Sequence, residues 1–254
     1  MQNLTVTFDS NVWENIVDEQ KRVNDLTYDT LYELIIQKRI TPFFFEGIAT
    51  TETILKKDRK DYFKDYKATI SFQIENEKPS ITEGTKAPEL TPYLQENIPK
   101  ALNLGFKFIK FPRIGGISLN IDTKYIAEDK LYSLKERLDR SFECAKYIEK
   151  LGAGKKQLEN KLDGNSDKGI INQTKNDINT SQKQYAKGIA EWVDADALSA
   201  HYGYGINYFC TNDKASGAGQ SSVFSEKNLK EIKNKFNIRV VTPSELIELI
   251  NLNV

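Results

Sequence analysis

Short runs of β-branched and aromatic residues near both ends of the chain alternate with helical patterns, and this alternation most constrains the fold. The runs cover residues 4–8, 40–45, 207–210 and 238–241. Consecutive strands that are separated by a helix pair in parallel, because the crossover returns the chain to the same edge of the sheet. The sequence therefore predicts an α/β fold in which helices cover a parallel sheet.

Capping residues mark where the helices of the first part begin. A Ser, Thr, Asn or Asp side chain can accept a hydrogen bond from the first helical turn, so such residues are sought before each helical pattern. The caps expected here are Ser10 or Asn11, then Thr27, then Thr50 or Thr51 for a helix that carries Glu52.

The last part of the chain repeats the same alternation. Helical patterns cover residues 186–202 and 226–236. The pattern of Thr242, Pro243 and Glu245 predicts the start of the final helix, because these residues have the spacing of a cap, a first-turn proline and a capping-box glutamate. We expect residues 1–55 and 186–254 to form the two halves of one sheet domain.

The middle of the chain, residues 56–185, is expected to be an α+β insertion that interrupts this domain. It contains strand patterns at 68–74 and 106–111, which a loop with proline and glutamate separates. Leucines at helical spacing then predict a long amphipathic helix over 127–151. Residues 152–183 are dominated by polar side chains and are expected to be a mobile loop or a solvated helical hairpin.

The composition limits the classes of function. The 36 basic and 36 acidic residues cancel, so the net charge neither predicts nor excludes nucleic acid as a ligand. The two cysteines, Cys144 and Cys210, lack the spacing of metal ligands and favour a reducing, cytoplasmic location. No signal peptide and no membrane-spanning segment is evident, so a soluble protein with no membrane partner is expected.

Acidic residues follow two of the predicted strands. Asp9 comes directly after the run Leu-Thr-Val-Thr-Phe, and Asp213 comes shortly after Asn-Tyr-Phe-Cys. In open α/β sheets ligands bind beyond the carboxyl ends of parallel strands, so both carboxylates can point to one place. This pattern indicates a metal-dependent hydrolytic site, although Asp9 also fits a simple helix cap and Asp213 an ordinary turn residue.

Four stretches together resemble a PIN domain. They are Val-Thr-Phe-Asp-Ser-Asn-Val-Trp at 6–13, Asp-Ala-Asp-Ala-Leu-Ser-Ala at 194–200, Asn-Tyr-Phe-Cys-Thr-Asn-Asp-Lys at 207–214 and Ile-Arg-Val-Val-Thr-Pro-Ser-Glu-Leu at 238–246. The resemblance covers about residues 1–55 and 186–254. It implies a Rossmann-like three-layer parallel sheet with helices on both faces and a Mg²⁺- or Mn²⁺-dependent nuclease that commonly acts on RNA.

The resemblance also implies which acids bind the metal ion and act in catalysis. The matching positions are Asp9, Glu52, Asp196 and Asp213, with Glu46 as a competitor of Glu52 and Asp194 as an addition to or replacement of Asp196. Positions two apart on a helix point about 200° from each other, so Asp194 and Asp196 can approach one site only if the helix begins between them.

The chemistry of carboxylate clusters predicts a metal site independently of the resemblance. Converging carboxylates repel one another and need a cation, and oxygen ligands suit Mg²⁺ or Mn²⁺. A bound ion can lower the pKa of its water and offset the charge that develops at a phosphodiester. Asn11, Thr211 and Asn212 are expected to hold the carboxylates or the attacking water.

The function expected from sequence is therefore that of a cytoplasmic endonuclease, with single-stranded RNA as its first candidate substrate. The alternative is a PIN-like module that has lost catalysis and serves in nucleic-acid binding or assembly. An antitoxin-like or other protein partner and a homodimer remain open. The sequence has no Walker motif, no dinucleotide fingerprint and no nucleophile elbow.

Overall fold

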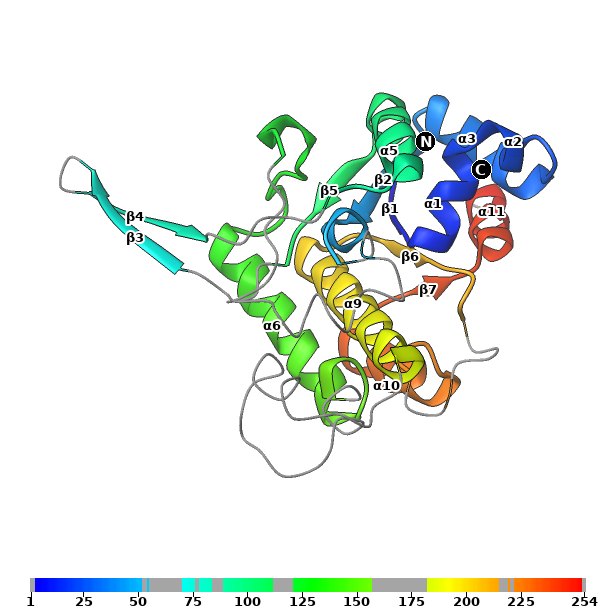
Figure 1. Cartoon of the computed structure of the whole chain (residues 1–254). Coiled ribbons are helices and arrows are strands. Elements are labelled where there is room, and N and C mark those ends of the chain that lie inside the picture. The colour runs from blue at the N-terminus through cyan, green and yellow to red at the C-terminus, as the bar shows by residue number, and fades with distance from the viewer. Residues whose placement is uncertain are drawn as a thin grey trace.

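A parallel sheet of five strands forms the centre of the computed structural model (Figure 1). The structure describes residues 3–51, 54, 70–75, 78–83, 89–111, 121–156, 182–214, 219 and 222–252. The sheet has the order β5-β2-β1-β6-β7, and every neighbouring pair is parallel. Its strands are β1 (Leu4–Phe8), β2 (Ile40–Phe45), β5 (Lys107–Ile109), β6 (Tyr208–Cys210) and β7 (Val240–Val241).

Helices cover both faces of the sheet. One face carries α1 (Ser10–Val17), α3 (Leu26–Ile36), α5 (Pro92–Leu104) and α11 (Pro243–Leu252), and the other carries α6 (Leu134–Lys150), α9 (Gln182–Tyr204) and α10 (Glu226–Phe236). Figure 1 shows these two groups of helices on opposite sides of the strands. The predicted three-layer, Rossmann-like α/β fold is confirmed.

Alternate residues along each strand supply the two cores. Phe44 and Cys210 face the core beneath α1, α3, α5 and α11, whereas Phe45 and Phe209 face the core beneath α6, α9 and α10. Phe44 is fully buried, and its ring stacks on that of Phe108 with centroids 4.2 Å apart. Because both faces are covered, the strands are apolar without strict alternation, which is typical of parallel sheets.

Aspartates cap the first long helices. Asp9 is the N-cap of α1, a role that the sequence also allowed for it, rather than Ser10 or Asn11, and its side chain accepts a hydrogen bond from the Ser10 amide. Asp25 caps α3 in place of Thr27. The strand ends at Phe8, so the first residue able to cap is the aspartate that follows it. This placement fixes the Asp9 carboxylate at the end of β1.

The central region differs most from the prediction. The expected loop between the strands at 68–74 and 106–111 contains β4 (Lys78–Glu83) and α5, and β4 pairs with β3 (Ile70–Glu75) as an antiparallel two-stranded sheet. The helix expected over 127–151 begins only at Leu134, because Ser133 and Glu136 form a capping box there.

Within the described part of the predicted insertion 56–185, β3 and β4 form a separate two-stranded sheet that projects from the molecule (Figure 1), but the other elements belong to the sheet domain. β5 pairs with β2, and α5 and α6 each cover one face. The sheet domain is thus larger than its expected ranges, 1–55 and 186–254. Of the expected mobile stretch 152–183, residues 157–181 lie outside the described residues.

The remaining short helices are α2 (Glu19–Arg22), η1 (Glu46–Ala49) and η2 (Thr123–Tyr125).

The predicted start of α11 is confirmed: the Thr242 amide donates to Glu245 Oε2 over 2.7 Å, and the Glu245 amide donates to Thr242 Oγ1 over 3.3 Å. Among the described residues, no helix combines the length and the apolar character that crossing a membrane requires.

Candidate active site

The strand order singles out the sheet edge between β1 and β6 as a candidate ligand site. From β1 the chain builds the sheet outward through β2 and β5, and it then returns to the other side of β1 to add β6 and β7. The strand order therefore reverses between β1 and β6, and such a switch point is where open α/β sheets bind their ligands. Asp9 follows β1 at this point, and Asp213 follows β6.

Asp9 is held from two sides. Its Oδ1 accepts a hydrogen bond of 2.7 Å from the Ser10 amide, and its Oδ2 accepts one of 2.6 Å from Thr211 Oγ1. The side chain is buried, and burial raises the pKa of Asp9 to about 6. The nearby charge of Asp213 also raises this pKa, whereas the hydrogen bonds from Thr211 and Ser10 lower it. The carboxylate is thus tightly positioned and easily protonated.

Asp213 is exposed and is held by the same residues that surround Asp9. Its Oδ2 accepts a hydrogen bond of 2.8 Å from Asn11 Nδ2, and its amide donates to Thr211 Oγ1 over 3.1 Å. The Asn212 amide donates to Asn11 Oδ1 over 3.1 Å. The three expected supporting residues, Asn11, Thr211 and Asn212, therefore join the end of β6 to the start of α1.

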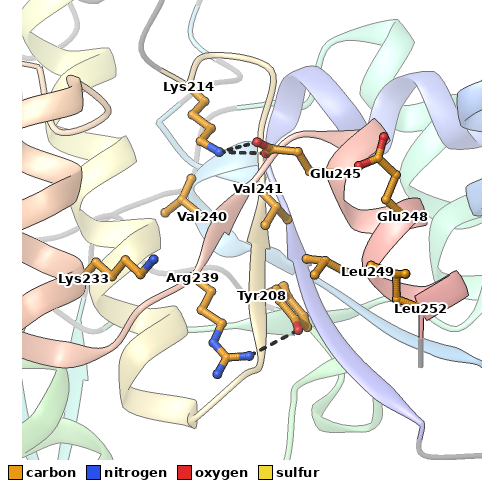
Figure 2. A pocket seen from close by; sticks show the side chains of 10 residues that line it. All are labelled: Tyr208, Lys214, Lys233, Arg239, Val240, Val241, Glu245, Glu248, Leu249 and Leu252. Carbon is orange, nitrogen blue, oxygen red and sulfur yellow. Dashed lines mark hydrogen bonds and ion pairs between the residues drawn. The ribbon is translucent and has the colours of Figure 1, made fainter.

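No cation of the described chain neutralises this pair of carboxylates. Neither Asp9 nor Asp213 forms an ion pair with a described lysine or arginine. Lys214 is the next residue in the chain, but its Nζ lies 2.7 Å from both carboxylate oxygens of Glu245 (Figure 2). The side chains of Asp9 and Asp213 thus lie together at the switch point with no positive partner from the described residues.

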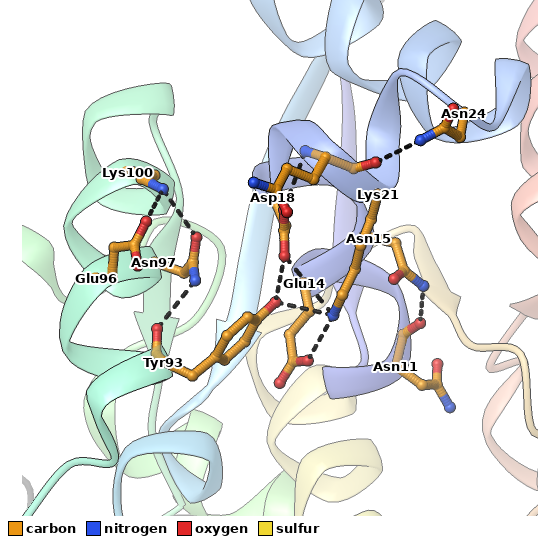
Figure 3. Close-up of polar contacts among 11 residues, drawn as sticks. Asn11, Glu14, Asn15, Asp18, Lys21, Asn24, Tyr93, Glu96, Asn97 and Lys100 are labelled. Carbon is orange, nitrogen blue, oxygen red and sulfur yellow. Dashed lines mark hydrogen bonds and ion pairs between the residues drawn. The ribbon is translucent and has the colours of Figure 1, made fainter.

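The helix that carries Asn11 is anchored along its length. The Asn11 carbonyl accepts hydrogen bonds from Asn15 Nδ2 over 2.8 Å and from Asn212 Nδ2 over 2.9 Å. Further along, Lys21 Nζ lies 3.7 Å from Glu14 Oε2 and donates to Tyr93 Oη over 3.0 Å (Figure 3). These contacts tie α1 and α2 to α5, so the Asn11 side chain has a rigid support.

A second pair of acids lies at the same edge of the sheet. Glu46 follows β2 directly and is buried. Its Oε1 accepts a hydrogen bond of 3.0 Å from the Phe111 amide, while its Oε2 is buried without a hydrogen bond from any described residue and lies 4.0 Å from Lys110 Nζ. Burial raises the pKa of Glu46 to about 7, opposed by the charge of Lys110, and the nearby charge of Asp196 adds to the rise.

Asp196 belongs to this second pair. It is buried in α9, which begins at Gln182 and therefore does not begin between Asp194 and Asp196. The two side chains point to different sides of the helix. Asp196 is buried beside Glu46, whereas Asp194 is half-buried. The condition under which both could approach one site is not met.

Only part of the expected four-acid cluster lies within the described residues. Glu52 lies outside the described residues. Within the described residues, no three His, Cys, Asp or Glu side chains are close enough together to hold one metal ion. The structure thus brings Asp9 together with Asp213 and Asp196 together with Glu46, as two pairs.

Two residues near the site were not foreseen. Lys110 approaches Glu46 because it follows β5, and the prediction placed that strand in an insertion rather than beside β2. Tyr28 Oη accepts a hydrogen bond of 3.0 Å from Asn212 Nδ2, and a contact between residues so far apart in the sequence leaves no local signal.

His201 takes no part in either pair. It is buried, its Nδ1 lies 3.0 Å from Thr7 Oγ1, and burial lowers its pKa to about 3. It is therefore a neutral core residue. Cys210 is also buried in the core, as its position in a strand suggests.

Comparisons of the chain with protein-family models, with curated proteins and with solved structures gave no match.

Proposed function

We propose that the protein is a divalent-metal-dependent nuclease of PIN-like type. The observation that carries this proposal is the pair Asp9 and Asp213, which lies at the switch point of the sheet and lacks a cationic partner among the described residues. Asp9 is buried, and the charge of Asp213 adds to the rise of its pKa, so an external cation at this edge would offset the repulsion between the two carboxylates.

The oxygen atoms around Asp9 and Asp213 are ligands that fit Mg²⁺ or Mn²⁺. They are carboxylate, amide and hydroxyl oxygens, which these hard cations prefer. Asp9 and Asp213 would hold the ion. Of the further ligands that the resemblance implies, Glu52 lies outside the described residues, and Asp196 lies with Glu46 rather than with this pair. When bound, such an ion supplies an activated water and offsets the charge that develops on a phosphodiester.

The residues of the chain prepare the site in three ways. Thr211 fixes Asp9 Oδ2 through its hydroxyl group, and Asn11 fixes Asp213 Oδ2 through its amide, so both carboxylates are oriented before a ligand arrives. Asp213 is exposed, so a ligand can reach it from solvent. Because the pKa of Asp9 is about 6, its carboxylate is charged at pH 7 and becomes neutral in mild acid. Activity should therefore fall as the pH falls through about 6.

Single-stranded RNA is the substrate that the resemblance favours, with DNA as its comparison. The alternative function, a PIN-like nucleic-acid-binding or assembly module without catalysis, is favoured by one observation. No third acid joins Asp9 and Asp213 within the described residues. The nuclease and the binding module predict different results in a cleavage assay.

The test is cleavage of labelled single-stranded RNA and DNA in Mg²⁺, Mn²⁺ or EDTA. The wild type would be compared with Asp9→Asn, which keeps an oxygen to accept from Thr211. Asp139→Asn is the matched control, because Asp139 is an exposed acid of α6 that forms an ion pair with Lys135. We expect metal-dependent cutting by the wild type and the control, and its loss in Asp9→Asn.

Two results would reject the nuclease. Equal cutting by Asp9→Asn and by the wild type would remove Asp9 from the mechanism. A folded wild type that binds RNA but never cuts it would establish the binding module instead.

A further inference from the structure

Within the described residues, the outer edge of the sheet at β7 has no neighbouring strand. Phe209 donates its amide to the Arg239 carbonyl over 2.9 Å, and Thr211 donates to the Val241 carbonyl over 3.0 Å. Alternate residues of a strand bond to the same neighbour, so the N–H and C=O of Val240 point away from β6. No described residue hydrogen-bonds to these two groups. An unpaired edge of this kind can pair with another extended chain.

A pocket of about 460 Å³ lies along this open edge (Figure 2). Its walls come from β7, from α10 through Lys233, and from α11 through Leu249 and Leu252. Leu252 is 82% exposed, which is unusual for a leucine that lines a pocket. The pocket therefore combines an unpaired backbone with an apolar wall.

The charge of the pocket favours an acidic ligand. Lys214 and Glu245 neutralise each other across its rim. Lys233 and Arg239 form no ion pair with a described residue, and Arg239 Nη1 has only a long contact of 3.4 Å with Tyr208 Oη. Glu248 is the one lining carboxylate outside an ion pair among the described residues. Two positive groups thus face one negative group.

We propose that this edge binds an extended acidic segment of a partner polypeptide, which adds a strand beside β7. Its backbone would pair with the N–H and C=O of Val240, a carboxylate would meet Lys233 and Arg239, and an apolar side chain would cover Leu249 and Leu252. Main-chain pairing supplies affinity in such complexes, and alternate side chains supply specificity.

Two other occupants fit less well. The phosphates of a nucleic acid cannot donate a hydrogen bond to the Val240 carbonyl, and they would lie close to Glu248. A second copy of this chain would place Lys233 and Arg239 opposite their own equivalents, because a two-fold interface pairs the same patch with itself. The positive groups of the two copies would then lie close together and repel each other.

The first experiment uses synthetic peptides on the full chain. The probe is a blocked eight-residue peptide that alternates glutamate and valine, labelled for fluorescence anisotropy. Its controls are the same peptide with lysine for glutamate, and a version methylated on every backbone nitrogen, because methylation of alternate nitrogens would leave one edge of the peptide free to pair. We expect saturable binding of the glutamate peptide, with the lysine peptide weaker by about tenfold or more and the methylated peptide inactive.

Variants of the protein then locate the peptide. Val240→Pro removes the outward N–H without removing a ladder bond to β6, a position at which edge strands tolerate proline. It should abolish binding. Lys233→Glu with Arg239→Glu should exchange the preference between the glutamate and lysine peptides, and this readout does not depend on whether the proline variant folds.

Several outcomes would overturn the proposal. These are no saturable binding of any peptide to the folded wild type, equal binding by a folded Val240→Pro variant, or an unchanged charge preference in the double variant. A wild-type dimer that Val240→Pro converts to a monomer would assign the edge to a second copy. Displacement of the peptide by single-stranded RNA, together with loss of RNA binding in the Lys233→Glu and Arg239→Glu double variant, would assign the edge to nucleic acid.

Discussion

The two acid pairs lie at one edge of the same sheet but in opposite electrostatic settings. Asp9 and Asp213 are held by neutral hydrogen-bond donors, and Asp213 is exposed. Glu46 and Asp196 are both buried, and the charges of Lys110 and Arg137 lower the pKa of Glu46. A pair that is open and lacks a cation can receive one from solution. A pair that is enclosed beside cations of its own chain has less need of one.

The strongest test of this difference compares Asp213→Asn with Glu46→Gln in the cleavage assay. We expect Asp213→Asn to lower the rate by about 10²-fold or more, the size of effect produced by removing one electrostatic group from a catalytic site. Glu46→Gln should change it by less than about tenfold, because the amide oxygen can still accept from the Phe111 amide. Equal losses in both variants would mean that the two pairs act as one site.

The pH dependence of stability should distinguish the buried pair. The pKa of Glu46 rises from its ordinary value of 4.5 to about 7 in the folded protein. The unfolded chain therefore loses this proton first as the pH rises, and the free energy of unfolding decreases between pH 4.5 and 7. The gap corresponds to roughly 3 kcal/mol at most.

Urea unfolding from pH 4 to pH 8 measures this decrease. In Glu46→Gln the part of the decrease near pH 7 should disappear, while the part that Asp9 contributes below about pH 6 should remain. An identical pH profile in the wild type and in Glu46→Gln would show that the Glu46 carboxyl is not held in its neutral form.

Stabilisation by metal ions should distinguish the open pair. An ion that binds only the folded state at a hundred times its Kd adds about 2.7 kcal/mol to the free energy of unfolding. We expect Mg²⁺ or Mn²⁺ to raise the Tm of the wild type and of Glu46→Gln, but not that of Asp213→Asn. A rise that persists in Asp213→Asn and vanishes in Glu46→Gln would reverse the roles of the two pairs.

Local patterns account for the parts of this structure that the sequence predicts well. The strands 4–8 and 40–45 and the helix 226–236 have the predicted bounds, because each combines a clear apolar period with a polar boundary. Asp9 and Asp213 meet as expected, since parallel strands that end in acids bring them to one edge. These inferences need only the neighbouring residues and the rule for parallel sheets.

Long-range contacts account for the parts that the sequence does not predict. α5 contains Pro99 within its span, and a proline inside a helix argues for a loop. The helix nevertheless forms because Leu94, Ile98 and Ala101 pack into the core. The place of β5 beside β2 depends on strand order, which no local pattern specifies, and Lys110 near Glu46 follows from that order.

The smallest effect we predict concerns the Thr211 hydroxyl, which links the Asp9 carboxylate to the backbone amide of Asp213. Thr211 Oγ1 donates to Asp9 Oδ2 and accepts from the Asp213 amide. Thr211→Val keeps the shape of the side chain but leaves both groups without this partner, at a cost of about 1–2 kcal/mol in the free energy of unfolding. Thr211→Ser keeps the hydroxyl and should lose less.

The same substitution should also move the pH profile of cleavage. The Thr211 hydrogen bond lowers the pKa of Asp9, so its loss lets that pKa rise further above 6. The acid limb of the profile should therefore shift to higher pH in Thr211→Val and stay in place in Thr211→Ser. Lys110→Met, which acts on the enclosed pair, is the matched control and should leave this limb unmoved. A shift caused by Lys110→Met and not by Thr211→Val would place the titrating group of the reaction at Glu46, because only that carboxyl lies beside Lys110.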